Sequence, residues 1–177
     1  VEDLATVDAA FATLDQRFPD GIDFIVHAIG FSDKDQLRGR YADTTRDNFL
    51  MTMDISVYSF TAVARRAAAM MPNGGSMLTL TYYGAERVMP HYNVMGVAKA
   101  ALEASVRYLA ADFGPRDIRV NAISAGAMRT LSLAGISGGR GMIAQGRAMS
   151  AMKEDTSMEG VAGAALWLCS DLGLSTT

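Results

Sequence analysis

Apolar residues recur along the chain with two different periods, and the two periods predict two kinds of element. Apolar positions three or four residues apart predict helices, which fall over residues 4–18, 45–71, 92–113 and 157–169. Short segments rich in apolar residues lie between the helices and predict buried strands over residues 22–29, 76–81 and 118–124. Residues 125–141 hold five glycines, and we expect a mobile loop there.

Strands that alternate with long helices are typical of a parallel sheet covered on both faces. With right-handed crossovers, the pattern predicts one doubly wound, Rossmann-like domain of three α/β/α layers over residues 1–177. The chain begins inside a crossover helix and ends just after a helix, so we expect the domain to be incomplete at both ends, apparently lacking its first βα units and its last strand. No G-x-G-x-x-G turn follows a first strand, and the glycines of residues 135–139 lie in a loop.

Composition narrows the choice of partners. Half of the residues are apolar and 20% are charged, which is ordinary for a globular domain, while the net charge of −3 argues against a nucleic-acid partner. Two histidines and one cysteine argue against a zinc site, and no apolar stretch approaches the roughly 20 residues that span a bilayer. We therefore expect no metal, no membrane and a cytoplasmic location. His27 stands among apolar residues, which favours a core side chain over a catalytic one.

Small and polar residues follow the predicted strands at the edge of the sheet where ligands bind. In open parallel sheets that edge lies outside the carboxyl ends of the strands. The three exits there are residues 28–30, 81–83 and 124–127. Glycine and alanine at the first and third exits would let a flat ligand approach the backbone, although they could also simply form tight turns.

Tyr92 and Lys99 are seven positions apart, so on a helix they share one face about 10 Å apart along the axis. Met95 lies between them on that face, and Tyr82 leaves the second strand nearby. An ammonium near a phenol lowers the phenol's pKa, and both groups can donate hydrogen bonds to a developing negative charge. By itself such a pair could also be two solvent-exposed side chains on a helix surface with no catalytic role.

The segment from Leu80 to Lys99 closely resembles the active-site segment of the bacterial NADH-dependent enoyl-acyl-carrier-protein reductases, a branch of the short-chain dehydrogenase/reductase superfamily. Residues 28–31, 119–126 and 129–131 match the same family in the same order. In this branch the tyrosine and lysine are spaced Tyr-x6-Lys, as Tyr92 and Lys99 are. Most carbonyl-reducing members have Tyr-x-x-x-Lys, but this chain has Met95 where that tyrosine would stand.

The resemblance implies an oxidoreductase of fatty-acid biosynthesis that uses NAD as NADH. Hydride would pass to the β-carbon of a trans-2-enoyl thioester carried by acyl carrier protein. Tyr92 would donate a hydrogen bond to the thioester oxygen as negative charge develops there. Lys99 would hold the nicotinamide ribose, and Tyr82 would shape the acyl site and assist Tyr92. These three residues are the predicted catalytic group.

The resemblance also implies further contacts, a lid and an assembly. Cofactor contacts are expected at Val1, Ala28, Ile29, Gly30, Thr81, Lys99, Ala125, Gly126, Met128, Arg129, Thr130, Leu131 and Ser132. Substrate contacts are expected at Ser32, Tyr82, Tyr92 and Met95. Residues 131–142 would form a lid over the acyl chain, and the helices over residues 45–71 and 92–113 would pair subunits in a homotetramer. For Ser32 and Thr130 a loop hydroxyl or a helix cap is an equal alternative.

Two other functions stay open at this level. A different member of the superfamily would act on a carbonyl or an alcohol, which Met95 argues against. A non-catalytic cofactor-binding module would explain the absent glycine-rich turn, but the intact tyrosines and lysine argue against loss of activity. Acyl-chain length and the choice between NADH and NADPH are not encoded in the residues that we can interpret.

Overall fold

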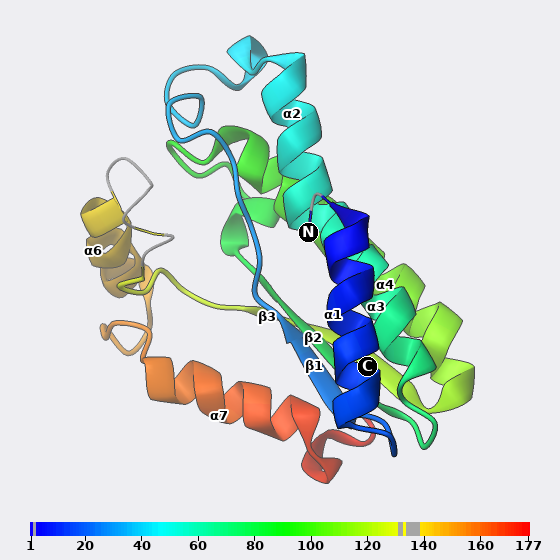
Figure 1. The fold of residues 1–177 in the computed structure, drawn as a ribbon. Coiled ribbons are helices and arrows are strands. Elements are labelled where there is room, and N and C mark those ends of the chain that lie inside the picture. The colour runs from blue at the N-terminus through cyan, green and yellow to red at the C-terminus, as the bar shows by residue number, and fades with distance from the viewer. Residues whose placement is uncertain (2, 131–132, 134–138) are drawn as a thin grey trace.

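A computed structural model describes residues 1, 3–130, 133 and 139–177 of the chain. Three parallel strands form its sheet in the order β1, β2, β3 (Figure 1). Their bounds are Phe24–His27 for β1, Gly75–Thr81 for β2 and Ile118–Ser124 for β3. His27 pairs with Thr79, and Thr81 pairs with Ser124, so the strands end near one edge of the sheet.

Helices cover both faces of this sheet. On one side lie α1 (Leu4–Arg17), α3 (Ser59–Ala69) and α4 (Asn93–Phe113), while α7 (Met158–Cys169) packs on β2 and β3 from the other side (Figure 1). Helix α2 (Arg46–Met53) runs into α3 through a π-helical turn at Asp54–Tyr58, and α6 (Gly139–Met149) lies beyond β3. Short 3₁₀ turns occur at Tyr41–Asp43, Tyr83–Ala85, Gly114–Arg116 and Asp171–Gly173. The predicted α/β fold is confirmed.

Local sequence signals set several of these boundaries. Thr45 caps α2 by accepting the Asn48 N–H at 3.3 Å, and Ser157 caps α7 by accepting the Gly160 N–H at 2.9 Å. Gly114 and Pro115 end α4 by forming a tight 3₁₀ turn. These are the positions at which the hydrophobic pattern also predicted a change of element.

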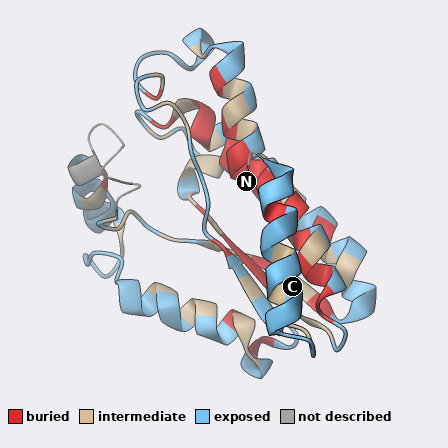
Figure 2. Cartoon of the chain, viewed as in Figure 1, coloured by how far each residue is buried: buried red, intermediate tan, exposed pale blue. Residues whose placement is uncertain are grey.

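The core lies between the sheet and the layer formed by α3 and α4. Phe60, Met77, Leu102 and Ile118 have no exposed surface, and Figure 2 shows buried residues gathered along these helices and strands. Figure 2 also shows that α1 and α7 are mostly exposed on their outer faces. The best-packed part of the molecule is therefore the part that carries β2 and α4. Tyr82 directly follows β2, Tyr92 directly precedes α4, and Lys99 lies within α4.

Two expectations about elements were wrong. β1 is shorter than residues 22–29 and is not fully buried, because Phe24 and Val26 are 52% and 49% exposed. Alternate side chains of a strand point to opposite faces, so Phe24 and Val26 share one face of the sheet. The helix that packs on this face, α7, lies against β2 and β3, which leaves Phe24 and Val26 exposed. Helix α6 begins at Gly139, inside residues 125–141 where the sequence predicted a mobile loop, since glycines weaken the helical signal there. The lid expected over residues 131–142 stays a prediction.

The described residues hold neither a membrane-spanning helix nor a cluster of metal ligands. No helix among them is long and apolar enough to cross a bilayer. Among the same residues, no group of three or more histidine, cysteine, aspartate or glutamate side chains could hold a metal ion.

Candidate active site

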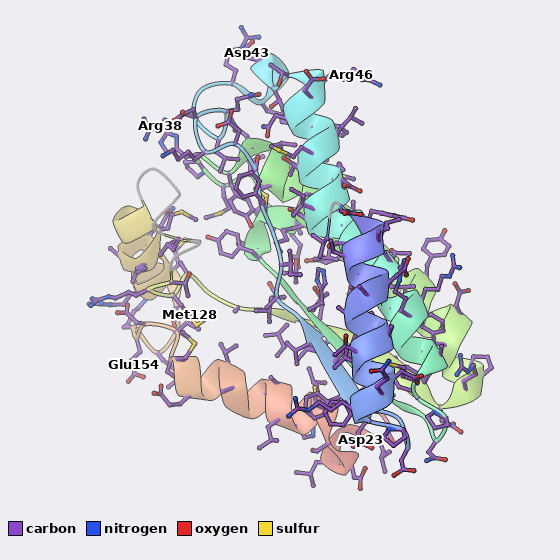
Figure 3. All side chains as sticks on the ribbon, in the orientation of Figure 1. Asp23, Arg38, Asp43, Arg46, Met128 and Glu154 are labelled. Atoms are coloured by element: carbon purple, nitrogen blue, oxygen red, sulfur yellow. The ribbon has the colours of Figure 1, made fainter. Side chains whose placement is uncertain are left out.

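A cavity of about 1080 Å³ opens at the carboxyl ends of the three strands. Its walls come from the exits of all three strands, from α4 and from α6. Most of the predicted site residues line it, namely Ala28, Ile29, Gly30, Ser32, Thr81, Tyr82, Tyr92, Met95, Lys99, Ala125, Gly126, Met128 and Thr130. Figure 3 shows Met128 at the far end of the segment that leaves β3, toward α6. Segments far apart in the sequence thus build one ligand-sized cavity.

The structure does not bring every predicted cofactor contact to this cavity. Val1 is 37% exposed ahead of α1 and is not part of the cavity wall. Arg129 is exposed as well, and it lies close enough to Asp155 for its positive charge to help lower the pKa of that carboxyl, after the larger effect of a hydrogen bond from Arg147. Leu131, Ser132 and most of the predicted lid lie outside the described residues. Met142, at the end of that predicted lid, is buried in α6 and lines the cavity.

Tyr92 and Tyr82 form the aromatic centre of the cavity. Their ring centroids are 5.0 Å apart at 70°, an edge-to-face arrangement. Tyr92 immediately precedes α4 and is only 6% exposed. Its neighbours His91 and Asn93 have positive φ values of 59° and 36°, which is uncommon for residues other than glycine. Between these two residues, Tyr92 lines the cavity at the start of the helix.

Burial raises the pKa of Tyr92 above its ordinary value, and a neighbouring charge on Tyr82 would raise it further. Burial also raises the pKa of Tyr82. The expectation that Lys99 would lower the pKa of Tyr92 was therefore wrong. The reason is that the ammonium is directed elsewhere, since Lys99 Nζ donates to the Leu80 carbonyl at 2.7 Å. Tyr92 is therefore protonated at neutral pH.

Lys99 is 9% exposed, and burial lowers its pKa to about 8, although the carboxylate of Glu103 opposes this shift. Glu103 also accepts a hydrogen bond from the Thr81 hydroxyl at 2.7 Å. The Thr81 hydroxyl is thus turned toward α4, while Thr81 itself still lines the cavity. We did not predict a role for Glu103, although its position four residues after Lys99 on one helix face could have indicated it.

The hydroxyls of Ser32 and Thr130, each predicted as either a ligand contact or a local loop or cap hydroxyl, form hydrogen bonds within the protein. Ser32 Oγ donates to Asn48 Oδ1 at 3.3 Å and accepts from Thr52 Oγ1 at 2.9 Å. Thr130 Oγ1 accepts the Leu133 N–H at 3.2 Å, as a capping hydroxyl does. Both residues also line the cavity, where a contact with a ligand stays a prediction.

His27 is a core side chain, as its sequence context predicted. It is 3% exposed, and its ring nitrogens lie 2.8 Å from Ser59 Oγ and 3.3 Å from Thr79 Oγ1. Burial, with a smaller effect of the Lys99 charge, lowers its pKa to about 4, so the ring is neutral at physiological pH. It does not line the cavity.

Fold and cavity together define a Rossmann-like α/β protein with an open cavity at the carboxyl edge of its parallel sheet, where proteins of this class bind ligands. The family model described as Enoyl-(Acyl carrier protein) reductase matches residues 1–177. The chain belongs to that family, and the resemblance predicted from its motifs is confirmed.

Individual relatives agree with this assignment. The Enoyl-[acyl-carrier-protein] reductase [NADH] 1 of Rhizobium meliloti is 62% identical over 177 residues, which are 100% of this chain and 65% of the relative. The solved enoyl-(acyl-carrier-protein) reductase of Anaplasma phagocytophilum in complex with NAD is 55% identical, with a TM-score of 0.94 over 99% of this chain and 66% of that one. A Bacillus cereus enoyl-acyl carrier protein reductase with NADP+ and indole naphthyridinone is 45% identical, with a TM-score of 0.96 over 99% and 68%. The chain thus spans about two thirds of the length of these relatives.

Proposed function

We propose that this chain carries the catalytic part of an NADH-dependent enoyl-acyl-carrier-protein reductase of fatty-acid elongation. The observation that carries the proposal is the buried Tyr92, which faces the cavity beside Tyr82 and shares it with Met95 and Lys99. Met95 occupies the place where the carbonyl-reducing relatives have their tyrosine. This arrangement favours C=C reduction over action on a carbonyl or an alcohol, and the intact constellation argues against a non-catalytic module.

The cavity suits a nicotinamide cofactor together with an acyl thioester. Its volume of about 1080 Å³ lies just above the range typical of small-molecule sites, which leaves room for both molecules. A methyl group added at Gly30 would lie 3.7 Å from Met95 Cε and 3.9 Å from Lys99 Nζ, so this stretch of wall stands directly against the two side chains. When bound, reduced nicotinamide supplies the hydride that is added to the β-carbon of the enoyl group.

The chain's own residues supply the electrostatic part of the reaction. Addition of hydride to the β-carbon moves negative charge onto the thioester oxygen. Tyr92, kept protonated by its burial, donates a hydrogen bond to that oxygen, and a donor placed in advance is worth roughly a hundred- to thousandfold in rate. Lys99 adds positive charge to the same cavity and binds the ribose hydroxyls of the cofactor.

NADH as cofactor is supported by the names of the Rhizobium meliloti and Anaplasma phagocytophilum relatives, and the Bacillus cereus complex with NADP+ makes NADPH the comparison to test. Acyl carrier protein as substrate carrier, a cytoplasmic location and a homotetramer complete the proposal. Exposed apolar side chains on the outer faces of the α2–α3 unit and α4 support the assembly, namely Leu50, Tyr58 and Tyr108. Light scattering of the full-length protein tests the tetramer, and cell fractionation tests the location.

The decisive experiment measures NADH oxidation by the full-length protein with a crotonyl thioester. Tyr92→Phe and Lys99→Ala are expected to lower kcat/KM by at least about a hundredfold. Tyr83→Phe is the matched control, because Tyr83 is 42% exposed and does not line the cavity. Faster turnover of a 3-ketoacyl thioester than of the enoyl thioester would instead assign the carbonyl chemistry.

A further inference from the structure

Four buried polar side chains on the α2–α3 unit belong to none of the catalytic groups above. Asn48, Thr52, Ser56 and Ser59 are 3%, 0%, 0% and 2% exposed, and we call them the buried polar stripe. Polar groups are costly to bury unless they form hydrogen bonds. An ordinary amphipathic helix would present apolar residues at these positions, so the partners of the stripe show what it does.

The π-helical turn keeps the stripe on one face of the helix. Positions four apart on an α-helix advance about 40° beyond a full turn, so a row with that spacing gradually rotates away from a fixed partner. A π turn accommodates one extra residue, and here it is closed by the Ser59 N–H, which bonds to the Asp54 carbonyl five residues earlier. Ser56 lies within this turn.

The partner of the stripe is the segment of residues 31–33, which follows β1. Ser56 Oγ accepts the Phe31 N–H at 2.9 Å and donates to the Phe31 carbonyl at 3.0 Å. A hydroxyl can do both because it has one proton and two lone pairs. One buried side chain thus satisfies both backbone polar groups of Phe31.

Two further members of the stripe bond to the next two residues of the same segment. The stripe and the segment run in opposite directions, since Ser56, Thr52 and Asn48 contact residues 31, 32 and 33 in turn. Thr52 Oγ1 donates to Ser32 Oγ at 2.9 Å, and Asn48 Oδ1 accepts the Asp33 N–H at 3.0 Å. Among the described residues, this segment lies outside the strands, since β1 ends at His27. Side chains of the stripe therefore provide hydrogen bonds that a sheet ladder would otherwise provide.

This segment is also part of the cavity wall, because Phe31, Ser32 and Asp33 line it. Ser56 stands directly behind the wall. Its Oγ lies 3.8 Å from Met95 Sδ, and a methyl group added at Gly30 would be 3.7 Å from the same oxygen. A shift of the segment would therefore change the shape of the cavity beside Met95.

We infer that Asn48, Thr52 and Ser56 are positioning residues that fix residues 31–33 as a rigid wall of the ligand site. Ser59, the fourth member, bonds instead to His27 and to the Ile55 carbonyl, neither of which faces the cavity. The identity of the ligand rests on the proposed function, whereas the fixing of the wall does not. The stripe acts through the segment that it holds and does not itself touch a substrate.

Ser56→Ala and Ser59→Ala form a matched pair, because each removes one almost fully buried hydroxyl from the same helical unit. In the full-length protein, we expect both to lower the melting temperature by similar amounts. Only Ser56→Ala should speed hydrogen exchange of a peptide spanning residues 28–34, by about tenfold. The same variant should raise the KM for NADH or for crotonyl thioester about tenfold, with kcat within about twofold of the wild type.

Thr52 offers a second test that keeps the side-chain volume nearly constant. Thr52→Val removes the hydroxyl and should reproduce the effect on KM and on exchange, and Thr52→Ser keeps the hydroxyl and should restore both. This pair decides the inference if Ser56→Ala does not fold.

The outcomes separate the inference from the proposed function. The inference would be overturned if KM and exchange changed equally in Ser56→Ala and Ser59→Ala, or if neither changed in Ser56→Ala. It would also be overturned if Thr52→Ser behaved like Thr52→Val. If the wild-type protein does not reduce crotonyl thioester, the proposed function fails. The exchange comparison then still decides whether the stripe holds the wall.

Discussion

The buried ammonium of Lys99 should make the stability of this protein depend on pH in a specific way. Lys99 is 9% exposed, and its pKa falls from an ordinary 10.5 to about 8, mainly because burial disfavours the charged form. The perturbation that tests this is Lys99→Met, which keeps an unbranched apolar side chain and removes the charge.

The sign and size follow from proton linkage. An unfolded lysine keeps its proton up to pH 10.5, whereas folded Lys99 loses it near pH 8. Between these values the unfolded state binds more protons, so the free energy of unfolding rises with pH. This gain in stability disappears again when the pH falls below 8. The full cost of the buried charge is about 3 kcal/mol, of which roughly 2 kcal/mol is recovered between pH 8 and pH 10.

Urea unfolding of the full-length protein at pH 7, 8, 9 and 10 measures this contribution. Wild type should gain roughly 2 kcal/mol relative to Lys99→Met between pH 8 and pH 10. Above pH 10 the raised pKa of Tyr92 acts in the opposite direction, since an unfolded tyrosine loses its proton first. Lys153→Met, at an exposed lysine, should follow the wild-type curve. Parallel curves for wild type and Lys99→Met would refute the reasoning.

Three other predictions rest on single contacts. Gly84→Ala would place a methyl group 2.5 Å from Tyr92 Cδ1, so the ring must move, and steady-state assays should show kcat at least about tenfold lower with NADH affinity nearly unchanged. Lowering the pH from 6.5 to 4 should cost wild type about 3 kcal/mol relative to His27→Gln in urea unfolding, because the pKa of His27 falls to about 4 on folding and only the unfolded ring gains a proton in that range. Glu103→Gln removes a charge that raises the pKa of Lys99, so the alkaline limit of NADH binding, followed by fluorescence titration, should move to lower pH.

The sequence by itself determined where the three strands and the long helices around them lie, although not the full extent of β1 or the start of α6. β3 was predicted at residues 118–124, where it lies, because a short segment rich in apolar and β-branched residues follows the turn at Gly114 and Pro115. The α4 prediction at residues 92–113 was correct to within one residue, since its 3.6-residue period ends at Gly114 and Pro115. Family motifs then placed Tyr82, Tyr92 and Lys99 together, and the structure brings them to one cavity.

Only the tertiary structure decided which groups these side chains meet. The sequence paired Lys99 with Tyr92, but the ammonium bonds to the Leu80 carbonyl 19 residues earlier in the chain. It gave no role to Ser56, whose partner Phe31 lies 25 residues away. Hydrophobic periodicity reports which face of an element avoids water, and it is therefore a local property. Hydrogen-bond partners and pKa shifts depend instead on which distant segments pack against that face, and the folded chain alone fixes them.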